Sequence, residues 1–117
     1  MKKLIYIIED DEDILTILNI FFKKKGYKVI ADYNGNQFKI PGKPCPDVYL
    51  IDVNLRDKNG FDLCKKIKEQ CKSTHVVLMS ANIYLEKMAI ECDADAFIHK
   101  PFDLENLFEI IDHVAAL

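Results

Sequence analysis

The sequence lacks any hydrophobic run long enough to cross a lipid bilayer. Its first apolar stretch, Leu4 to Ile8, follows two lysines in the manner of a secretory signal, but it is short and leads directly into acidic side chains. A membrane span needs about 20 apolar residues, and the core of a signal peptide needs about 7 or more. We therefore interpret this stretch as a strand, and we expect a cytoplasmic protein that makes no contact with the membrane.

The chain also lacks a strong charge imbalance and the closely paired cysteines of zinc or redox sites. Its formal net charge is -3, which gives no electrostatic support for nucleic acid or an anionic membrane as the main partner. None of its cysteines has C-x-x-C spacing; they are Cys45, Cys64, Cys71 and Cys92. Because free cysteines are usually buried, we expect reduced and partly buried thiols.

Internal repeats and low-complexity tracts are missing as well. The length of 117 residues suits one compact domain and leaves no room for a second folded unit. Half of the residues are hydrophobic and 30% are charged, which is ordinary for a globular protein and argues against disorder. We expect residues 1–117 to form a single domain without an output domain, so that any output acts through this domain's own surface.

The sequence does contain an alternation of two periodicities. Short apolar runs predict parallel strands covered on both faces, at residues 4–8, 27–31, 48–51, 76–79 and 94–98. Between them, apolar residues recur at helical spacing, over residues 14–21, 61–71, 85–92 and 104–111. Pro41 and Gly42 interrupt the segment where a second helix belongs, so we expect that helix to be short or irregular. Five such units predict a doubly wound α/β fold.

Polar side chains closely follow the apolar runs. The carboxyl ends of parallel strands share one edge of such a sheet, so we expect one site there, built from Glu9, Asp10, Asp52, Ser80 and Lys100. Three carboxylates in one pocket repel each other unless a cation joins them, and Mg²⁺ prefers such oxygen ligands. A carboxylate beside that ion can act as a nucleophile toward a phosphoryl group, whose oxygens a lysine and a hydroxyl would hold.

Four segments together resemble the receiver domain of two-component response regulators. They are "IIEDDEDIL", "PDVYLIDVNLRDKNGFDLC", "VVLMSA" and "AFIHKPFD", and they follow one another in the family's order over essentially the whole chain. The resemblance implies a flavodoxin-like five-stranded parallel sheet of order 2-1-3-4-5 with five flanking helices. It also implies that Asp52 is the phosphoacceptor, and that Mg²⁺ is held by Glu9, Asp10, Asp52 and the backbone carbonyl of Asn54.

The resemblance assigns three further roles and one peptide geometry. Ser80 would be the switch hydroxyl, Lys100 the contact to the phosphoryl group, and Phe97 the aromatic residue whose rotamer follows Ser80. The Lys100–Pro101 peptide would be cis, which proline permits at modest cost. The sequence departs from the family at Arg56, where proline is usual, and Phe97 lacks the hydroxyl of the more common tyrosine.

Some of these residues have simpler interpretations. Acids at residues 11–13 can merely stabilise the start of the first helix through its dipole. Ser80 can cap the following helix, and Phe97 can serve core packing alone. The three histidines have no spacing that indicates a metal site.

The resemblance implies a signalling switch rather than a turnover enzyme. A sensor histidine kinase or a histidine phosphotransfer protein would donate the phosphoryl group, and the domain would catalyse its own phosphorylation and autodephosphorylation at Asp52. The surface of the fourth helix, fifth strand and fifth helix would then shift to control a downstream protein, and a phosphorylation-dependent homodimer is an open option. Asn54 and Asn82 are expected to face the attacking water and to set the lifetime of the acyl phosphate.

Two other functions use similar residues. A phosphatase of the haloacid dehalogenase type also combines a nucleophilic aspartate with a hydroxyl residue, a lysine and Mg²⁺. It requires a second acid two positions after the nucleophile, where this chain has Asn54. A receiver-like module that binds partners without phosphorylation is the second alternative, and a failure to bind Mg²⁺ would favour it.

Overall fold

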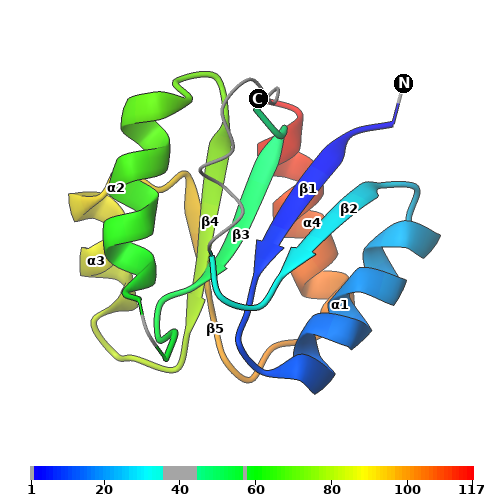
Figure 1. The fold of residues 1–117 in the computed structure, drawn as a ribbon, viewed down its shortest axis with the longest axis horizontal. Coiled ribbons are helices and arrows are strands. Elements are labelled where there is room, and N and C mark those ends of the chain that lie inside the picture. Colours follow the sequence, from blue (N-terminus) through cyan, green and yellow to red (C-terminus); the bar gives the residue numbers. More distant parts are fainter. Residues whose placement is uncertain (1, 36–44, 57) are drawn as a thin grey trace.

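A computed structural model gives the structure of residues 2–35, 45–56 and 58–117. Five strands form one sheet of order β2-β1-β3-β4-β5 (Figure 1), and each neighbouring pair is parallel. The strands are β1 (Leu4–Ile8), β2 (Lys28–Asp32), β3 (Val48–Asp52), β4 (His75–Ser80) and β5 (Ala96–His99). The predicted doubly wound sheet and its strand order are therefore confirmed.

The described residues contain four helices, whereas the sequence predicts five. They are α1 (Glu12–Lys24), α2 (Gly60–Gln70), α3 (Leu85–Glu91) and α4 (Leu104–Ala115). The short second helix of the prediction falls on the segment around Pro41 and Gly42, which lies outside the described residues. The third, fourth and fifth predicted helices thus correspond to α2, α3 and α4.

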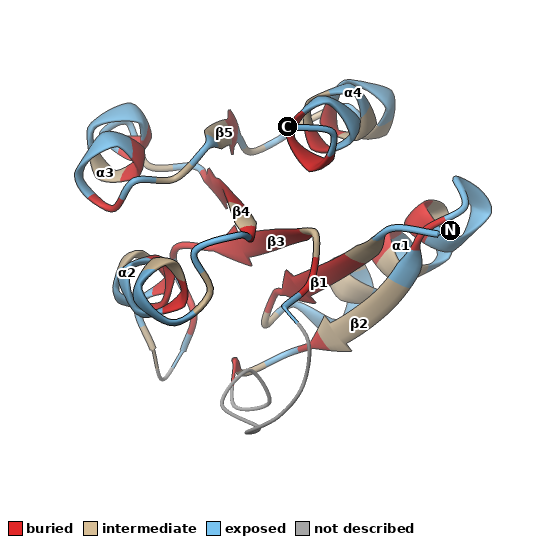
Figure 2. Ribbon diagram, turned by 90° about the horizontal axis from the view of Figure 1, so that it is seen from above, coloured by how far each residue is buried: buried red, intermediate tan, exposed pale blue. Residues whose placement is uncertain are grey.

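Helices cover both faces of the sheet, with α1 and α4 on one side and α2 and α3 on the other (Figure 2). Because successive side chains of a strand point to opposite faces of the sheet, each central strand contributes side chains to two hydrophobic clusters, one on each face. In β1, Ile5 and Ile7 pack in the cluster of α1 and α4, whereas Tyr6 and Ile8 pack in the cluster of α2 and α3. Burial on both faces explains why the central strands read as continuous apolar runs.

Helix ends follow the signals in the sequence. The Asp11 carboxylate accepts hydrogen bonds from the amides of Asp13 and Ile14 at 3.0 and 3.1 Å, so it caps α1. This agrees with the simpler interpretation of the later acids. Gly26 follows the end of α1 with φ of 96°, a left-handed conformation that favours glycine. Asp103 caps α4 through the amides of two following residues.

The cysteine prediction is wrong for one pair. Cys45 and Cys71 form a disulfide that joins the approach to β3 with the end of α2. Their separation of 26 residues gives no recognisable sequence signal, because only the fold brings them together. Cys64 and Cys92 are free and buried, as expected.

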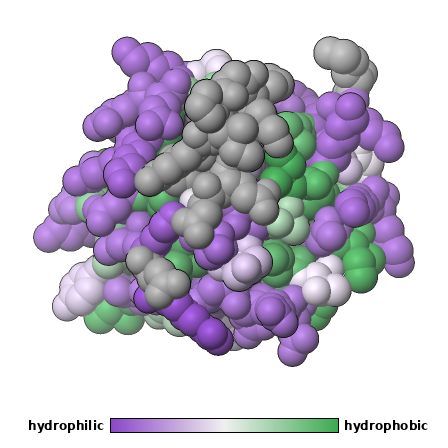
Figure 3. Space-filling view, viewed as in Figure 1, coloured by the Kyte–Doolittle hydropathy of each residue, from purple (hydrophilic) through white to green (hydrophobic). Residues whose placement is uncertain are grey.

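The surface is largely hydrophilic on the face shown in Figure 3, with hydrophobic patches between the charged side chains. In the part of the chain that the structure describes, no helix combines the length and apolar content needed to span a membrane.

Candidate functional site

The carboxyl ends of four strands bring the predicted side chains to one edge of the sheet. Glu9 follows β1 directly, Asp52 ends β3, Ser80 ends β4, and Lys100 follows β5. The amide of Lys100 donates a hydrogen bond to the carbonyl of Ser80 at 2.9 Å, which extends the pairing of β4 and β5 to the site. The Lys100–Pro101 peptide is cis, as predicted.

Three carboxylates form the centre of this site. One oxygen each from Glu9, Asp10 and Asp52 lies within 4.8 Å of the others. The ligands of a single Mg²⁺ lie at most about 4.2 Å apart, since each sits about 2.1 Å from the ion. The separations in the cluster approach this limit, and the donor set consists of oxygen alone. The residues therefore fit a hard divalent cation.

Lys100 supplies the positive charge inside the site. Its Nζ atom lies 3.1 Å from both carboxylate oxygens of Glu9 and 3.3 Å from Oδ2 of Asp52. Burial alone would lower the pKa of Lys100, but the charges of Asp52 and Glu9 outweigh it and raise that pKa. The ammonium group thus stays charged and bridges two buried acids.

The surroundings of Glu9 disfavour the charged form of its side chain. Only 1% of its surface is exposed. Burial, followed by the hydrogen bond and charge of Asp52, raises the pKa of Glu9 to about 7, and Lys100 offsets only part of this rise. A cation bound to the cluster would stabilise the charged forms that burial and mutual repulsion disfavour.

A polar network connects Asp52 to Ser80. The amide of Asn54 donates to Oδ1 of Asp52 at 3.1 Å, and its side-chain amide donates to Oγ of Ser80 at 3.3 Å. The amide of Asn82 also donates to Oγ of Ser80, at 3.0 Å. Ser80 therefore orders the start of the following loop rather than capping α3, whose N-cap residue Tyr84 makes no side-chain cap bond. Both acceptor contacts leave the Ser80 hydroxyl proton available for donation.

Phe97 lies on β5, paired in register with Leu78 of β4. It is partly buried and packs against the cluster of α2 and α3. Its ring also meets that of His99 edge to face, with centroids 5.8 Å apart. Phe97 thus lies at the border between the interior and the surface formed by α3 and β5.

Gly60 brings the start of α2 close to the end of β3. Its amide donates to the carbonyl of Val53 at 2.9 Å. A Cβ atom at this position would lie 2.8 Å from Cα of Val53 and would also clash with the carbonyl oxygen of Asp52. Only glycine permits this approach, and the Asn-Gly pair in the sequence was its visible signal.

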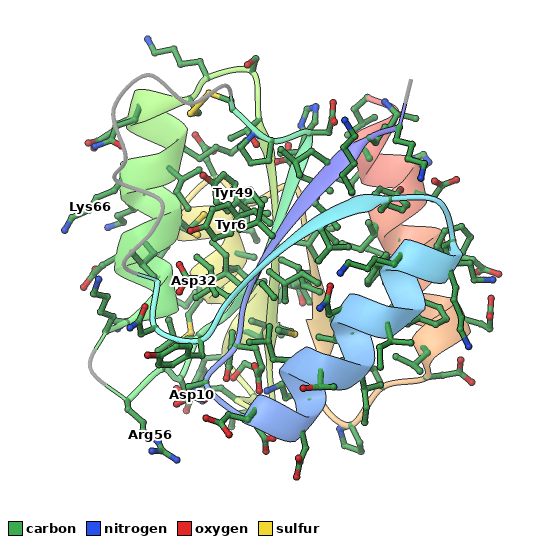
Figure 4. The ribbon with its side chains drawn as sticks, turned by 45° about the vertical axis from the view of Figure 1, so that its right-hand side comes forward. Tyr6, Asp10, Asp32, Tyr49, Arg56 and Lys66 are labelled. Atoms are coloured by element: carbon green, nitrogen blue, oxygen red, sulfur yellow. A yellow bond between two sulfur atoms is a disulfide. The ribbon has the colours of Figure 1, made fainter. Side chains whose placement is uncertain are left out.

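Sequence reasoning missed two sets of contacts near the site (Figure 4). Arg56 contacts Asp10, although the sequence marked Arg56 only as a departure from the family. Asp32 at the end of β2 is buried and accepts a hydrogen bond from the Tyr6 hydroxyl at 2.7 Å. An acid at a strand end looks like an ordinary turn residue in the sequence, so nothing local indicated its burial.

Known proteins share this fold and sequence pattern. The BeF3-activated receiver domain of DrrB from Thermotoga maritima is 26% identical, covers 100% of both chains and has a TM-score of 0.88. The HemR receiver domain from Leptospira biflexa is 27% identical over 99% of this chain and 96% of that one, with a TM-score of 0.88. A CheY-like receiver protein from Methanospirillum hungatei JF-1 is 25% identical over 99% and 95%, with a TM-score of 0.90. The family model of the response regulator receiver domain matches residues 5–112, and the chain therefore belongs to this family.

Proposed function

We propose that this receiver domain is a phosphoacceptor switch in which Asp52 takes a phosphoryl group from a histidine kinase or a histidine phosphotransfer protein. The observation that carries the proposal is the bridge from Lys100 to Glu9 and Asp52, beside three carboxylates within 4.8 Å. Ionisable groups that shift one another's pKa in this way are often found at functional sites.

The transfer exchanges one bond to phosphorus for another. A carboxylate oxygen of Asp52 forms a bond to the phosphorus atom while the P–N bond of the donor's phosphohistidine breaks. The electron pair of that bond leaves on the imidazole nitrogen, which takes a proton from water. Hydrolysis later breaks the acyl phosphate, with water adding to phosphorus and the Asp52 carboxylate leaving. The domain is thus not a turnover enzyme, but it catalyses both steps at its own side chain.

Glu9, Asp10 and Asp52 would hold Mg²⁺ together with the carbonyl of Asn54. When bound, the ion would neutralise the carboxylates and the charge on the phosphoryl oxygens. The protein's own groups position the nucleophile, because the amide of Asn54 holds Oδ1 of Asp52 and Lys100 approaches Oδ2. These two fixed donors orient the carboxylate before a donor arrives.

Phosphorylation would add about -1.5 to -2 charges at Asp52. Lys100 and the Ser80 hydroxyl are the groups placed to meet this charge. A Ser80 side chain drawn toward the phosphoryl group would alter the packing beside Phe97, and α3, β5 and α4 would shift between two arrangements. The shift in population can be no larger than the difference in stabilisation that these contacts provide.

The surface of α3, β5 and α4 would carry the signal to a downstream protein or to a second copy of the chain. The similar DrrB receiver is a BeF3-activated form, which supports beryllofluoride as a stable mimic of the phosphoryl group. Measuring the molecular mass in solution with and without beryllofluoride tests the homodimer. An unchanged monomer under both conditions would contradict dimerisation through this surface.

Asn54 and Asn82 would set the lifetime of the acyl phosphate. The side-chain contact of Asn54 with Ser80 supports this proposal. Asn82 contacts Ser80 through its backbone amide, and its side-chain oxygen accepts a hydrogen bond from the amide of Tyr84. Replacing both with alanine should change the rate of phosphate release, measured after removal of the donor. Equal release rates in the variant and the wild-type protein would reject this role.

The acceptor assignment is tested by incubating the protein with Mg²⁺ and acetyl phosphate. Intact-mass spectrometry should detect one added phosphoryl group, and Asp52→Asn should remain unmodified. Asp62→Asn is a matched control, since Asp62 is an exposed acid in the first turn of α2. Its labelling should equal that of the wild-type protein.

Undiminished labelling of Asp52→Asn would reject the acceptor assignment. A wild-type protein that neither binds Mg²⁺ nor becomes labelled would instead favour the phosphorylation-independent module. Turnover of a generic phosphate ester would favour the phosphatase, although Asn54 stands where that enzyme requires an acid.

A further inference from the structure

The loop after β3 brings Arg56 against Asp10, one of the three clustered acids. The Arg56 amide donates a hydrogen bond to Oδ2 of Asp10 at 3.0 Å. The Nε atom of the same residue lies 3.9 Å from that oxygen. Figure 4 shows both residues at the end of the molecule where the strands finish. One carboxylate oxygen of the cluster therefore interacts with both the backbone and the side chain of Arg56.

The backbone contact depends on which residue occupies position 56. Proline, which the family usually carries there, has no N–H and cannot make this hydrogen bond. Any other residue can make it. In this chain the contact links Asp10, which follows β1, to the loop that follows the phosphoacceptor strand. It holds Oδ2 in place and thereby orients the Asp10 carboxylate.

The side chain adds a permanent positive charge beside the cluster. A guanidinium group stays protonated at all ordinary pH values. Lys100 already contacts Glu9 and Asp52, so Arg56 supplies a cation to the remaining acid of the cluster. A divalent cation entering the site would meet this charge and share the same carboxylate.

The exposure of the pair decides which measurement can detect its role. The Arg56 side chain is 85% exposed, whereas that of Asp10 is 21% exposed. An ion pair with one such exposed partner contributes little to folding stability. The charge of Arg56 has a larger effect on a doubly charged ion beside Asp10, because the electrostatic energy grows with the product of the two charges. Metal affinity is therefore the informative quantity.

We propose that Arg56 is a positioning residue that tunes the metal affinity of this site through two opposing contacts. Its amide orients Asp10 for the ion, and its guanidinium is a resident cation whose charge opposes binding of the ion. The inference rests on the proposed function, because it assumes that Glu9, Asp10 and Asp52 bind Mg²⁺. It adds a residue outside the ligand set as the determinant of how tightly they bind.

Calorimetric titration of the whole chain with Mg²⁺ separates the two contacts. Arg56→Gln removes the charge but keeps the amide, so it should bind Mg²⁺ about three- to tenfold more tightly at about 0.01 M ionic strength. The gain should fall below about twofold at about 1 M, where the Debye length is about 3 Å. Arg56→Lys keeps the charge and should remain within about twofold of the wild-type affinity.

Arg56→Pro removes the charge and the amide together. It should bind Mg²⁺ about tenfold more weakly than Arg56→Gln, because partners that orient a metal ligand commonly contribute at least that much. Lys65→Gln is the matched control for the lost charge. Lys65 lies on α2 with its Nζ over the Phe61 ring, and its substitution should leave the affinity unchanged.

The outcomes distinguish this inference from the proposed function. If the wild-type protein binds Mg²⁺ and Asp52 is labelled, but Arg56→Gln binds no more tightly than Lys65→Gln, the resident-cation role is rejected and the function stands. Equal affinities of Arg56→Pro and Arg56→Gln would reject the orienting role of the amide. A wild-type protein that does not bind Mg²⁺ would overturn both the inference and the metal site.

Discussion

Replacing Gly60 with alanine sets two physical effects against each other. Gly60 is the first residue of α2, and helix propensity alone predicts that alanine stabilises a helix by up to about 1 kcal/mol. The added Cβ atom would lie 2.8 Å from Cα of Val53 and against the carbonyl of Asp52. These neighbours are backbone atoms, so relief requires movement of the strand end or of the helix. Overpacking of this kind costs about 1–3 kcal/mol.

The steric term should dominate, because nothing flexible lies in the path of the new atom. We expect Gly60→Ala to lower the free energy of unfolding by about 1–2 kcal/mol. The displaced Asp52 backbone should also slow labelling by acetyl phosphate. Urea denaturation followed by far-ultraviolet circular dichroism measures the stability, since the chain has no tryptophan for fluorescence.

Gly26→Ala provides the control. A Cβ atom at Gly26 would have no neighbour within 4 Å, but the backbone of this residue has a φ of 96°, a left-handed conformation that strains any residue with a side chain. The variant should lose about 1–2 kcal/mol from backbone strain while Asp52 labelling stays at the wild-type rate. A Gly60→Ala protein as stable and as readily labelled as the wild-type protein would refute the proposed close approach.

Three further predictions concern buried or partly buried acids. Asp52→Asn should raise the free energy of unfolding by about 1 kcal/mol in urea without Mg²⁺, because relief of the repulsion with Glu9 outweighs the lost contact with Lys100, which keeps Glu9 as its partner; a lower stability would contradict this. Tyr6→Phe should lower it by about 1–3 kcal/mol, since buried Asp32 loses one donor, and an unchanged urea midpoint would contradict this. Burial alone would raise the pKa of Asp95, but the hydrogen bond from Lys68 and others outweigh it and lower that pKa. Asp95 therefore stabilises the fold above its usual pKa of 3.8, and this stability is lost as pH falls through the lower folded value. The stability difference between the wild-type protein and Asp95→Asn should shrink below about pH 4, and a constant difference would exclude the effect.

The sheet could be predicted because strands that are buried on both faces appear in the sequence as short continuous apolar runs. The runs at residues 48–51 and 76–79 fall within β3 and β4, and the residues that follow each run lie at the edge of the sheet that carries the candidate site. Predictions were weaker where an interaction joins distant segments. The disulfide of Cys45 and the contact of Arg56 with Asp10 span 26 and 46 residues, and neither leaves a periodic signal.

Single strand-end residues were also ambiguous. The sequence also allowed Ser80 to act as a helix cap, and only the hydrogen bonds to its oxygen show that it orders the loop instead. Asp32 was overlooked for the same reason, because the Tyr6 hydroxyl that contacts it lies 26 positions away in the sequence.

The disulfide between Cys45 and Cys71 encloses β3, the Asp52 loop and α2 in one covalent ring. Asp52 lies inside this ring, whereas Ser80, Lys100 and α4 lie beyond it. Such a cross-link acts mainly on the unfolded chain, because it limits the conformations open to the enclosed segment. Reducing it should therefore lower the free energy of unfolding by about 2–4 kcal/mol, and the segment released would be the one that carries Asp52.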